Sequence, residues 1–445
     1  MKLLVLCTSA PHFPLELARQ SYHECLAFLG DNFNYEFIEL DEIITGTNTF
    51  DEKLRDLKLN QPDAMILIQG AFTWDNIAVY LHEYFNRIFT LLWTVPEKDY
   101  NKGVLGANSL CGAIMNNAAF HKLGMNNLFY YGKPQELECL RKIGDILKSM
   151  ECAKKIEKAR YGMVGYRPTG FYNSTFDEMS IRGILGIETV YLDLAALLID
   201  TEVIEDIILQ QDINNVKKIG RIGEASEESF LNSSKIYLAL KRFIEEERID
   251  FLSVQCWPVL MKRSVNPCLV LGRLTDEKIA AACESDFGGA LSMAIGVWLT
   301  DSGGVWLADL IDINKKNQSM YFWHCGAAPP SLSDERELPV INKQFRGLDR
   351  CNTCEFVLKE GEVTVLRFGI TQGRHRIFAF KGRSVFPEIR IRGNISEILP
   401  EREPESVLGK MVEYGIEHHL AILYGDELDN INRLSKLLGI DFFTV

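Results

Sequence analysis

Two acidic side chains lie within or directly after apolar stretches that are typical of buried strands. Glu284 follows Ala-Ala-Ala-Cys, and Asp309 lies inside Val-Trp-Leu-Ala-Asp-Leu-Ile. Burying a carboxylate without a partner costs free energy, and two carboxylates in one crevice repel each other unless a cation or a proton lies between them. A divalent cation meets that need, and oxygen ligands with one imidazole suit Mn²⁺ or Mg²⁺. Glu284 and Asp309 are therefore a candidate metal-binding pair.

Three histidines are candidates for the imidazole ligand. His324 ends an apolar run in Trp-His-Cys-Gly, and His418 and His419 are adjacent near the end of the chain. Each of these residues also has a purely structural interpretation when taken alone. Glu284 and Asp309 can cap a helix or a turn, and His324 can be an ordinary core histidine. His-His pairs are also common on surface helices, so the residue types leave both interpretations open.

The elements that must position these residues are short apolar strands. Residues 251–254, 279–283, 305–307 and 320–323 form four such runs, and each run ends in polar side chains. In open α/β sheets, ligands bind outside the carboxyl ends of the strands. The pattern therefore predicts one crevice, formed where these four strands end.

The chain divides into three parts. Residues 1–160 alternate apolar strands with amphipathic helices, and residues 161–328 repeat this pattern. Such alternation predicts parallel sheets with helices on both faces. Residues 329–445 turn to β-rich alternation with Gly turns, which favours a small barrel. The predicted fold is α/β: two doubly wound parallel-sheet domains followed by a β-rich C-terminal domain. Other predicted strands are residues 3–7, 35–40, 64–69, 354–358, 362–368, 376–380, 389–391 and 420–423.

Composition limits the class of protein and its partners. The chain has 445 residues, of which 47% are hydrophobic and 24% charged, and its formal charge is −13. That charge argues against a nucleic-acid partner, whose phosphates need a basic surface. No apolar run reaches the ~18 residues that span a bilayer. We therefore expect a cytoplasmic protein with no membrane partner.

The cysteines and the first strand argue against two further kinds of site, a structural zinc site and a dinucleotide-binding site. The 11 cysteines are scattered, which does not suggest a secreted disulfide scaffold. The single CxxC, from Cys351 to Cys354, has no second ligand pair close by, as structural zinc requires, so two half-buried cysteines on a turn are the favoured interpretation. The first strand leads into Cys-Thr-Ser-Ala-Pro rather than GxGxxG, which gives no sign of a dinucleotide cofactor.

Taken together, several motifs resemble the L-fucose isomerase-like family of aldose–ketose isomerases, whose L-arabinose isomerase relatives share the architecture. The resemblance runs from about residue 160 to the end, with weaker support from Asn-Ser-Leu-Cys-Gly at residues 108–112. The segments that carry it are Gln255-Cys-Trp-Pro, Cys283-Glu-Ser-Asp-Phe-Gly-Gly, Leu307-Ala-Asp, Trp323-His-Cys-Gly and Glu417-His-His…Tyr424-Gly-Asp.

The resemblance implies a role for each candidate ligand. In the family, the residues that match Glu284 and Asp309 bind Mn²⁺ and handle the transferred proton. The second histidine of the matching pair is the usual ligand, which implies this role for His419, with His418 as its neighbour. His324 resembles a position that is a metal ligand or a substrate contact in some branches. The resemblance also implies a homo-oligomer, either a trimer or a hexamer, in which the first domain lies beside a neighbour's active site.

The family's chemistry agrees with what these residues can do. An aldose–ketose isomerase moves a proton between C1 and C2 of a sugar through a cis-enediol. A metal ion polarises the carbonyl and stabilises the enediolate charge, while positioned carboxylates remove and return the proton. The expected substrate is a monosaccharide: a deoxyhexose, a pentose, or an anionic or sulfonated hexose such as sulfoquinovose.

Several side chains are candidates for binding that sugar. Trp257 suits stacking on a pyranose beside a carboxylate site. Four basic side chains could form an anion pocket. They are Arg167 and, near a barrel turn, the consecutive residues Arg374, His375 and Arg376. The full set of predicted substrate contacts is Trp257, Gln255, His324, His418, Trp74, Asn76 and Arg374.

Two other classes of function use the same residues. A glycoside hydrolase could employ Glu284 and Asp309 as acid and base, and a non-catalytic protein could bind sugars without converting them. Neither needs the His-His pair followed by Gly-Asp near the C-terminus, so the pattern favours the isomerase.

Overall fold

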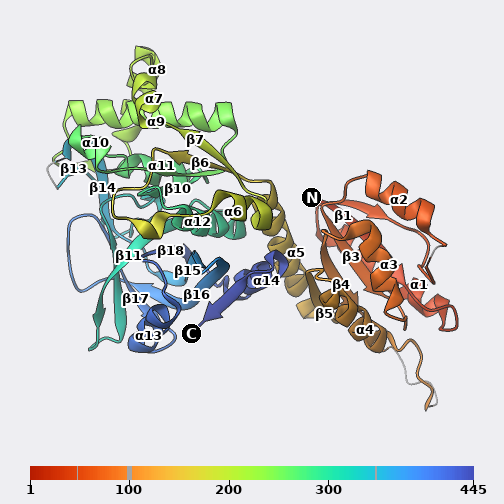
Figure 1. Cartoon of the computed structure of the whole chain (residues 1–445). Helices are drawn as coiled ribbons and strands as arrows, with labels where there is room; N and C mark the ends of the chain where they lie inside the picture. Colours follow the sequence, from red (N-terminus) through yellow and green to blue (C-terminus); the bar gives the residue numbers. More distant parts are fainter. Residues whose placement is uncertain (48, 98–102, 346–347) are drawn as a thin grey trace. The chain divides into compact units, whose positions relative to one another are not determined.

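The computed structural model describes residues 1–47, 49–97, 103–345 and 348–445. The chain divides into two compact units (Figure 1). The first comprises Met1–Lys154 and Asn432–Gly439, and the second comprises Lys155–Ile431 and Ile440–Val445. No helix in the described part of the chain is long and apolar enough to cross a membrane.

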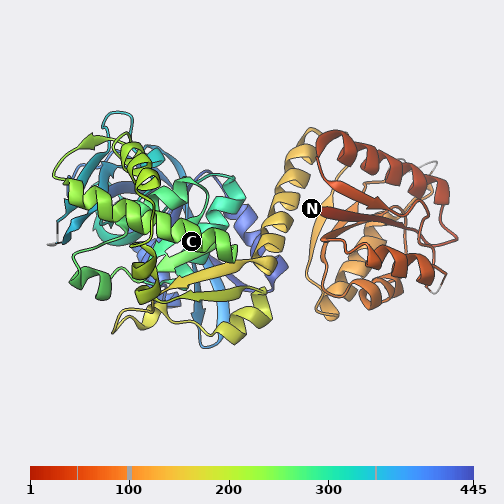
Figure 2. The same ribbon diagram turned by 90° about the horizontal axis from the view of Figure 1, so that it is seen from above.

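The first unit is built on a five-stranded parallel sheet in the order β2-β1-β3-β4-β5. Helices lie on both faces of this sheet (Figure 2), which is why the inner strands are apolar along nearly their whole length. The strands are β1 (Lys2–Thr8), β2 (Glu36–Glu39), β3 (Ala64–Gln69), β4 (Phe89–Thr94) and β5 (Asn127–Tyr131). The helices are α1 (Leu15–Asn32), α2 (Asp51–Leu59), α3 (Asn76–Phe85), α4 (Ser109–Lys122) and most of α5 (Leu137–Lys158).

The second unit begins with a four-stranded parallel sheet in the order β10-β9-β6-β7. Its strands are β6 (Arg160–Val164), β7 (Glu188–Leu192), β9 (Phe251–Val254) and β10 (Ala280–Cys283). Its helices are α6 (Glu178–Leu185), α7 (Leu194–Asp200), α8 (Asp206–Val216), α9 (Glu227–Glu247), α10 (Val259–Lys262), α11 (Cys268–Asp276) and α12 (Phe287–Thr300). These two parallel sheets confirm the predicted α/β class.

The second unit continues into a closed barrel. Among the described residues, six antiparallel strands follow the order β16-β15-β18-β11-β12-β17, and pairing of β17 with β16 closes the ring. They are β11 (Val305–Asn314), β12 (Ser319–His324), β15 (Gly361–Thr371), β16 (Arg374–Val385), β17 (Asn394–Pro400) and β18 (His419–Tyr424). Further elements are β8 (Arg221–Ile222), β13 (Val340–Gln344), β14 (Leu348–Val357), β19 (Asp441–Thr444), α13 (Pro404–Tyr414) and α14 (Leu428–Leu438). The predicted β-rich barrel is thus confirmed.

Helix α12 joins the two layers of the second unit. It packs against β9 and β10 on one side and against β15 and β18 on the other (Figure 1). A helix enclosed in this way must be apolar all round, and nearly every residue of α12 is buried. Because α12 begins directly after β10, it brings the end of the parallel sheet against the wall of the barrel.

Two predicted strands belong to a different layer from the one expected. Residues 305–307 and 320–323 were assigned to the second parallel sheet, but they lie in β11 and β12, an antiparallel pair of the barrel. Strand β11 continues through Asp309 and Asp312 to Asn314, so only a short turn separates it from β12. Parallel neighbours need a crossover of a dozen or more residues, and this turn leaves no room for one. The prediction failed because it ended the strand at its first acidic residue.

Other local predictions also need correction. Residues 389–391 are not a strand; the strand is β17, which begins at Asn394. Strands β4 and β5 were not predicted at all. Cys351 and Cys354 were expected on a turn and half buried, but both lie in β14 and neither is exposed to solvent.

Candidate active site

The candidate ligands meet where the end of the parallel sheet reaches the barrel. Glu284 directly follows β10, whereas Asp309 and His419 are directly opposite each other on the paired strands β11 and β18. Strand β12 pairs with the other edge of β11, where Asp309 is opposite Trp323, the residue that precedes His324. The site is therefore not one row of parallel strand ends, as predicted, but a junction between the two layers.

His419 lies between the two carboxylates. Its Nε2 atom is 3.7 Å from Oε2 of Glu284 and 3.7 Å from Oδ1 of Asp309. Oδ1 of Asp309 is buried and has no hydrogen-bond partner among the described residues. A buried carboxylate oxygen without a donor is costly, and a cation bound between these three side chains would remove that cost. The donor set of two carboxylates and one imidazole fits a divalent ion.

Asp286 holds His419 from behind. It accepts a hydrogen bond from Nδ1 of His419 at 2.9 Å, which leaves Nε2 as the nitrogen that faces the carboxylates. Arg367 donates two further bonds to Asp286, at 2.6 and 2.9 Å, and the Gly289 N–H donates another. Burial would raise the pKa of the Asp286 carboxyl, but the charge of Arg367 and the hydrogen bonds from Arg367 and His419 together outweigh burial and hold the pKa far below its usual range. Asp286 is therefore ionised, and it keeps His419 in one tautomer.

The two glycines after Asp286 permit this arrangement. A Cβ atom on Gly288 would lie 2.6 Å from the Phe368 carbonyl oxygen, and one on Gly289 would lie 2.6 Å from Oδ2 of Asp286. Both separations are shorter than the contacts that real Cβ atoms make, so any residue other than glycine would clash at either position. The Phe-Gly-Gly of the motif thus lets strand β15, which carries Arg367, approach the first turn of α12.

Sequence reasoning missed both Asp286 and Arg367, although each left a signal. Asp286 precedes an apolar helix at the position that favours an N-cap carboxylate. Arg367 is a charge inside the apolar strand β15, so it needs a buried partner by the same argument that singled out Asp309.

Glu284 has a strained backbone and polar side chains around its carboxylate. Its φ is 60° and that of Ser285 is 49°, a left-handed conformation that costs residues with a Cβ about 1–2 kcal/mol each. His418 Nε2 lies 3.3 Å from Oε2, and the Trp257 indole N–H donates to Oε1 at 3.3 Å. Burial would raise the pKa of Glu284, but the hydrogen bond with His418 and the nearby imidazoles outweigh it, so the pKa lies below its usual value.

One wall of the site is aromatic. Phe171, from the loop after β6, makes edge contacts with Trp257 and with the His418 ring. His418 is half buried, and its ring lies 3.9 Å from that of His419. Burial would lower the pKa of His418, but the hydrogen bond to Glu284 and the surrounding carboxylates raise it overall.

His324 approaches the junction from the barrel side. It is 5% exposed, and its ring lies 5.6 Å from that of His419. Its Nε2 atom lies 3.1 Å from Sγ of Cys283, the last residue of β10. His324 thus stands beside the junction, with a thiol next to it that the prediction did not include.

Other predicted substrate contacts are occupied elsewhere. Gln255 accepts a hydrogen bond from the Tyr166 N–H, which anchors the loop after β6. Arg374 is largely exposed and pairs with Asp441 at 3.6 Å. Arg376 is buried and donates to the carbonyl oxygens of Tyr414 and Gly415. His375, also buried, lies near Ser180.

Trp74 and Asn76 belong to the first unit. Trp74 is 46% exposed and its ring lies 5.0 Å from that of His12. Asn76 is the exposed first residue of α3. Their contact with a sugar stays a prediction.

No protein-family model matches the chain. A solute-binding protein of an ABC transporter from Burkholderia multivorans aligns with 67% of this chain and 92% of its own, at 10% identity and a TM-score of 0.19, which is too low to support an argument.

Three relatives, each named sulfoquinovose isomerase, are much more similar. The relative from Alkalicoccus urumqiensis is 28% identical over 407 residues, which cover 90% of this chain and 89% of its own length. The relative from Priestia aryabhattai is 26% identical over 436 residues, or 96% of each chain. The relative from Clostridium sp. (strain MSTE9) is 29% identical over 366 residues, or 79% of each chain. The resemblance seen in the motifs is thereby confirmed: over most of its length, the chain is similar to proteins named sulfoquinovose isomerase.

Proposed function

We propose that this protein is a metal-dependent aldose–ketose isomerase whose substrate is a sulfonated hexose, sulfoquinovose or a close analogue. The relatives' shared name supports the reaction and the substrate. The observation that carries the proposal is the convergence of three side chains: Nε2 of His419 is 3.7 Å from a carboxylate oxygen of Glu284 and of Asp309.

Glu284, Asp309 and His419 are the proposed ligands of a Mn²⁺ ion. The unpartnered Oδ1 of Asp309 supports this set, as does the position of Asp286 behind His419. A carboxylate behind a ligating imidazole fixes its orientation and strengthens it as a donor. When bound, the ion polarises the sugar carbonyl and stabilises negative charge on the neighbouring oxygens.

The same two carboxylates are the proposed proton-transfer groups. One removes the proton from C2 of the aldose, and a proton returned to C1 of the cis-enediol gives the ketose. The lowered pKa of Glu284 leaves it ionised at neutral pH, as a base requires. Positioned acid–base groups accelerate such steps about 10²–10⁴-fold. The aromatic wall of Phe171 and Trp257 offers an apolar face to the sugar and limits access of water.

Arg167 is the proposed partner of the sulfonate. Of the four basic side chains predicted to form an anion pocket, Arg374 is paired with Asp441, Arg376 is engaged by backbone carbonyls, and His375 is buried. The Arg167 guanidinium lies over the Tyr172 ring at 4.7 Å, and its buried Nε has no hydrogen-bond partner in the described residues. It belongs to the loop that carries Phe171, beside the proposed metal site. A guanidinium with unused donors suits a sulfonate group.

We further propose that the protein works in the cytoplasm as a homo-oligomer, a trimer or hexamer, on the basis of the family resemblance.

The test is isomerisation of sulfoquinovose in D₂O with Mn²⁺, followed by NMR. We expect the ketose to form, deuterium to appear at C2 of the recovered aldose, and both to stop after treatment with EDTA. Glucose serves as the uncharged control and should react far more slowly. Turnover that survives metal removal, or hydrolysis of a sulfoquinovoside without isomerisation, would contradict the proposal.

A further inference from the structure

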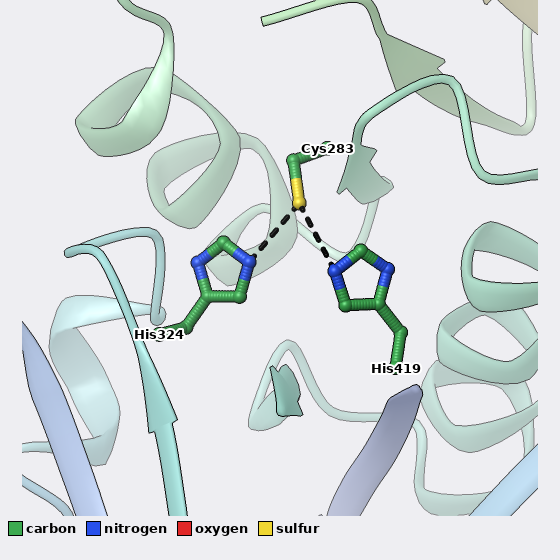
Figure 3. A group of neighbouring side chains, drawn as sticks. All are labelled: Cys283, His324 and His419. Atoms are coloured by element: carbon green, nitrogen blue, oxygen red, sulfur yellow. Dashed lines mark hydrogen bonds between the residues drawn. The ribbon is translucent and has the colours of Figure 1, made fainter. Parts of the chain in front are cut away.

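A second donor set overlaps the carboxylate site. Figure 3 shows the imidazoles of His324 and His419 directed at the sulfur of Cys283. Nε2 of His324 lies 3.1 Å from Sγ, and Nε2 of His419 lies 3.9 Å from it. All three donor atoms lie within 4.8 Å of one another, and all three residues are buried. We propose that Cys283, His324 and His419 form a second metal site, which binds a thiophilic divalent cation such as Zn²⁺ or Cd²⁺.

The distances fit a tetrahedral ion. Bonds of about 2.3 Å to sulfur and about 2.05 Å to nitrogen, at tetrahedral angles, separate sulfur from nitrogen by about 3.5 Å. The two observed separations, 3.1 and 3.9 Å, lie on either side of that value. Small side-chain rotations therefore suffice to bring the three atoms around one ion. A fourth position can be filled by Oδ1 of Asp309, which is 3.7 Å from Nε2 of His419.

The chemistry of the donors separates this set from the carboxylate set. Thiolate with imidazole is the combination that Zn²⁺ and Cd²⁺ prefer, whereas carboxylates with a single imidazole suit Mn²⁺ and Mg²⁺. When a water fills the fourth position of the Cys283 site, the His419 imidazole is the one ligand that this site has in common with the carboxylate site. Cys283 and Glu284 are adjacent in the chain, so one strand end presents a soft donor and a hard donor to neighbouring positions.

The proton balance of binding is simple. The Cys283 thiol loses its proton to solvent as the sulfur–metal bond forms. Nε2 of His324 must offer a lone pair to the ion, so in the metal-bound protein the ring proton lies on Nδ1, where Sγ of Cys325, 3.5 Å away, can accept it. The Cys325 N–H, which donates to Nδ1 at 3.0 Å in the metal-free protein, has to turn away from the ring for this. The proton of the Cys283 thiol, and any proton on Nε2 of His324, passes to solvent.

The two sites exclude each other. Nδ1 of His419 is bonded to Asp286, so Nε2 holds the only lone pair that this ring can give to a metal. One lone pair serves one ion, and the second site therefore competes with the first for His419. If the proposed function is correct, a thiophilic cation inhibits the isomerase by displacing Mn²⁺. The second site itself does not depend on the function.

Cadmium binding to the full chain tests the site. The protein is first treated with EDTA and then titrated with Cd²⁺, while the ultraviolet band of sulfur-to-cadmium charge transfer is recorded. We expect one Cd²⁺ ion per chain with this band, and loss of the band in Cys283→Ser. Cys354→Ser is the matched control, because Cys354 is also buried but its thiol is not one of the converging donor atoms; it should keep the band. His324→Gln removes a metal ligand. It should weaken Cd²⁺ binding by more than about 100-fold, because losing a residue that only hydrogen-bonds to a ligand already costs about 10–100-fold.

Competition between ions supplies the second measurement. Paramagnetic resonance of free Mn²⁺ should show that Cd²⁺ releases bound Mn²⁺ from the wild-type protein, and that this release needs a much higher Cd²⁺ concentration in Cys283→Ser. Circular dichroism confirms that each variant is folded, and Cys283→Ala replaces the serine variant if that one is not. A charge-transfer band that persists without Cys283, or Cd²⁺ and Mn²⁺ bound together at full occupancy, would overturn the second site. Failure of isomerisation alone would leave these binding results unaffected and would contradict only the proposed function.

Discussion

The two sides of the junction hold their acidic residues in different ways. On the sheet side, Glu284 lies in a left-handed turn after β10 and is held by an imidazole and an indole. On the barrel side, Asp309 lies within a regular strand, and pairing with β18 places it opposite His419. Residues in sparsely populated conformations cluster at functional sites because the surrounding structure must hold them there. Strand pairing alone therefore places the carboxylate on the barrel side, whereas the carboxylate on the sheet side depends on a strained turn that its neighbours must hold.

Replacing either carboxylate is expected to have the largest effect, and it tests whether both sides are needed. Glu284→Gln and Asp309→Asn should each lower kcat/KM by at least the about 10²–10⁴-fold that a positioned acid–base group provides. Both variants keep nearly the same shape, so unchanged circular dichroism and melting would separate catalysis from folding. Near-normal turnover in one of them would show that its side of the junction is dispensable.

The neighbouring histidines provide the next test, because only one is locked in place. His419→Ala should weaken Mn²⁺ binding by more than about 100-fold, since losing a ligand costs more than losing its outer partner. His418→Ala should retain the metal but raise the pKa of Glu284, whose lowered value depends on their hydrogen bond. Activity of His418→Ala should therefore begin to fall at a higher pH than in the wild type as the solution is acidified. If calorimetry showed the same loss of Mn²⁺ affinity in His418→Ala as in His419→Ala, the assignment of His419 alone as the ligand would be wrong.

Asp286 connects the sheet side to the barrel side, so its replacement sharpens the comparison. Asp286→Asn removes the charge behind His419 and should weaken Mn²⁺ binding about 10–100-fold. It also removes one of the two carboxylates that pair with the buried Arg367 guanidinium; Glu417 remains at 3.4 Å, so the loss of stability should be less than the about 3–5 kcal/mol that breaking a whole buried pair costs. Asp286→Asn combined with Arg367→Met removes both charges, and should recover much of the stability but not the metal affinity. Recovery of both would make Asp286 purely structural.

Replacing Arg167 should have the narrowest effect, because it should be confined to the anionic substrate. A hydrogen bond to a charged group contributes about 1.5–3 kcal/mol, so Arg167→Met should raise KM for sulfoquinovose about 10- to 150-fold. Steady-state kinetics should show little change in kcat, and Arg167→Lys should recover part of the loss. An unchanged KM would show that the sulfonate does not bind to Arg167.

Side-chain types and apolar runs were enough to predict the α/β class, the C-terminal barrel and the candidate ligands. Glu284 and Asp309 could be singled out because a charge beside or within an apolar run needs a partner, whatever the fold. The resemblance in the motifs then selected His419 over His418. Both inferences use information that is local in the chain.

Tertiary structure alone decided which of these residues meet and what stands behind them. Strands β11 and β12 resemble parallel strands in sequence, and only their pairing across a tight turn places Asp309 opposite His419. The bonds from Arg367 to Asp286, and the approach of His324 to Cys283, join segments far apart in the chain. Strand pairing and helix packing set such contacts, and neither is encoded in the residues next to them. For this reason, the composition of the site could be read from the chain, but its geometry required the fold.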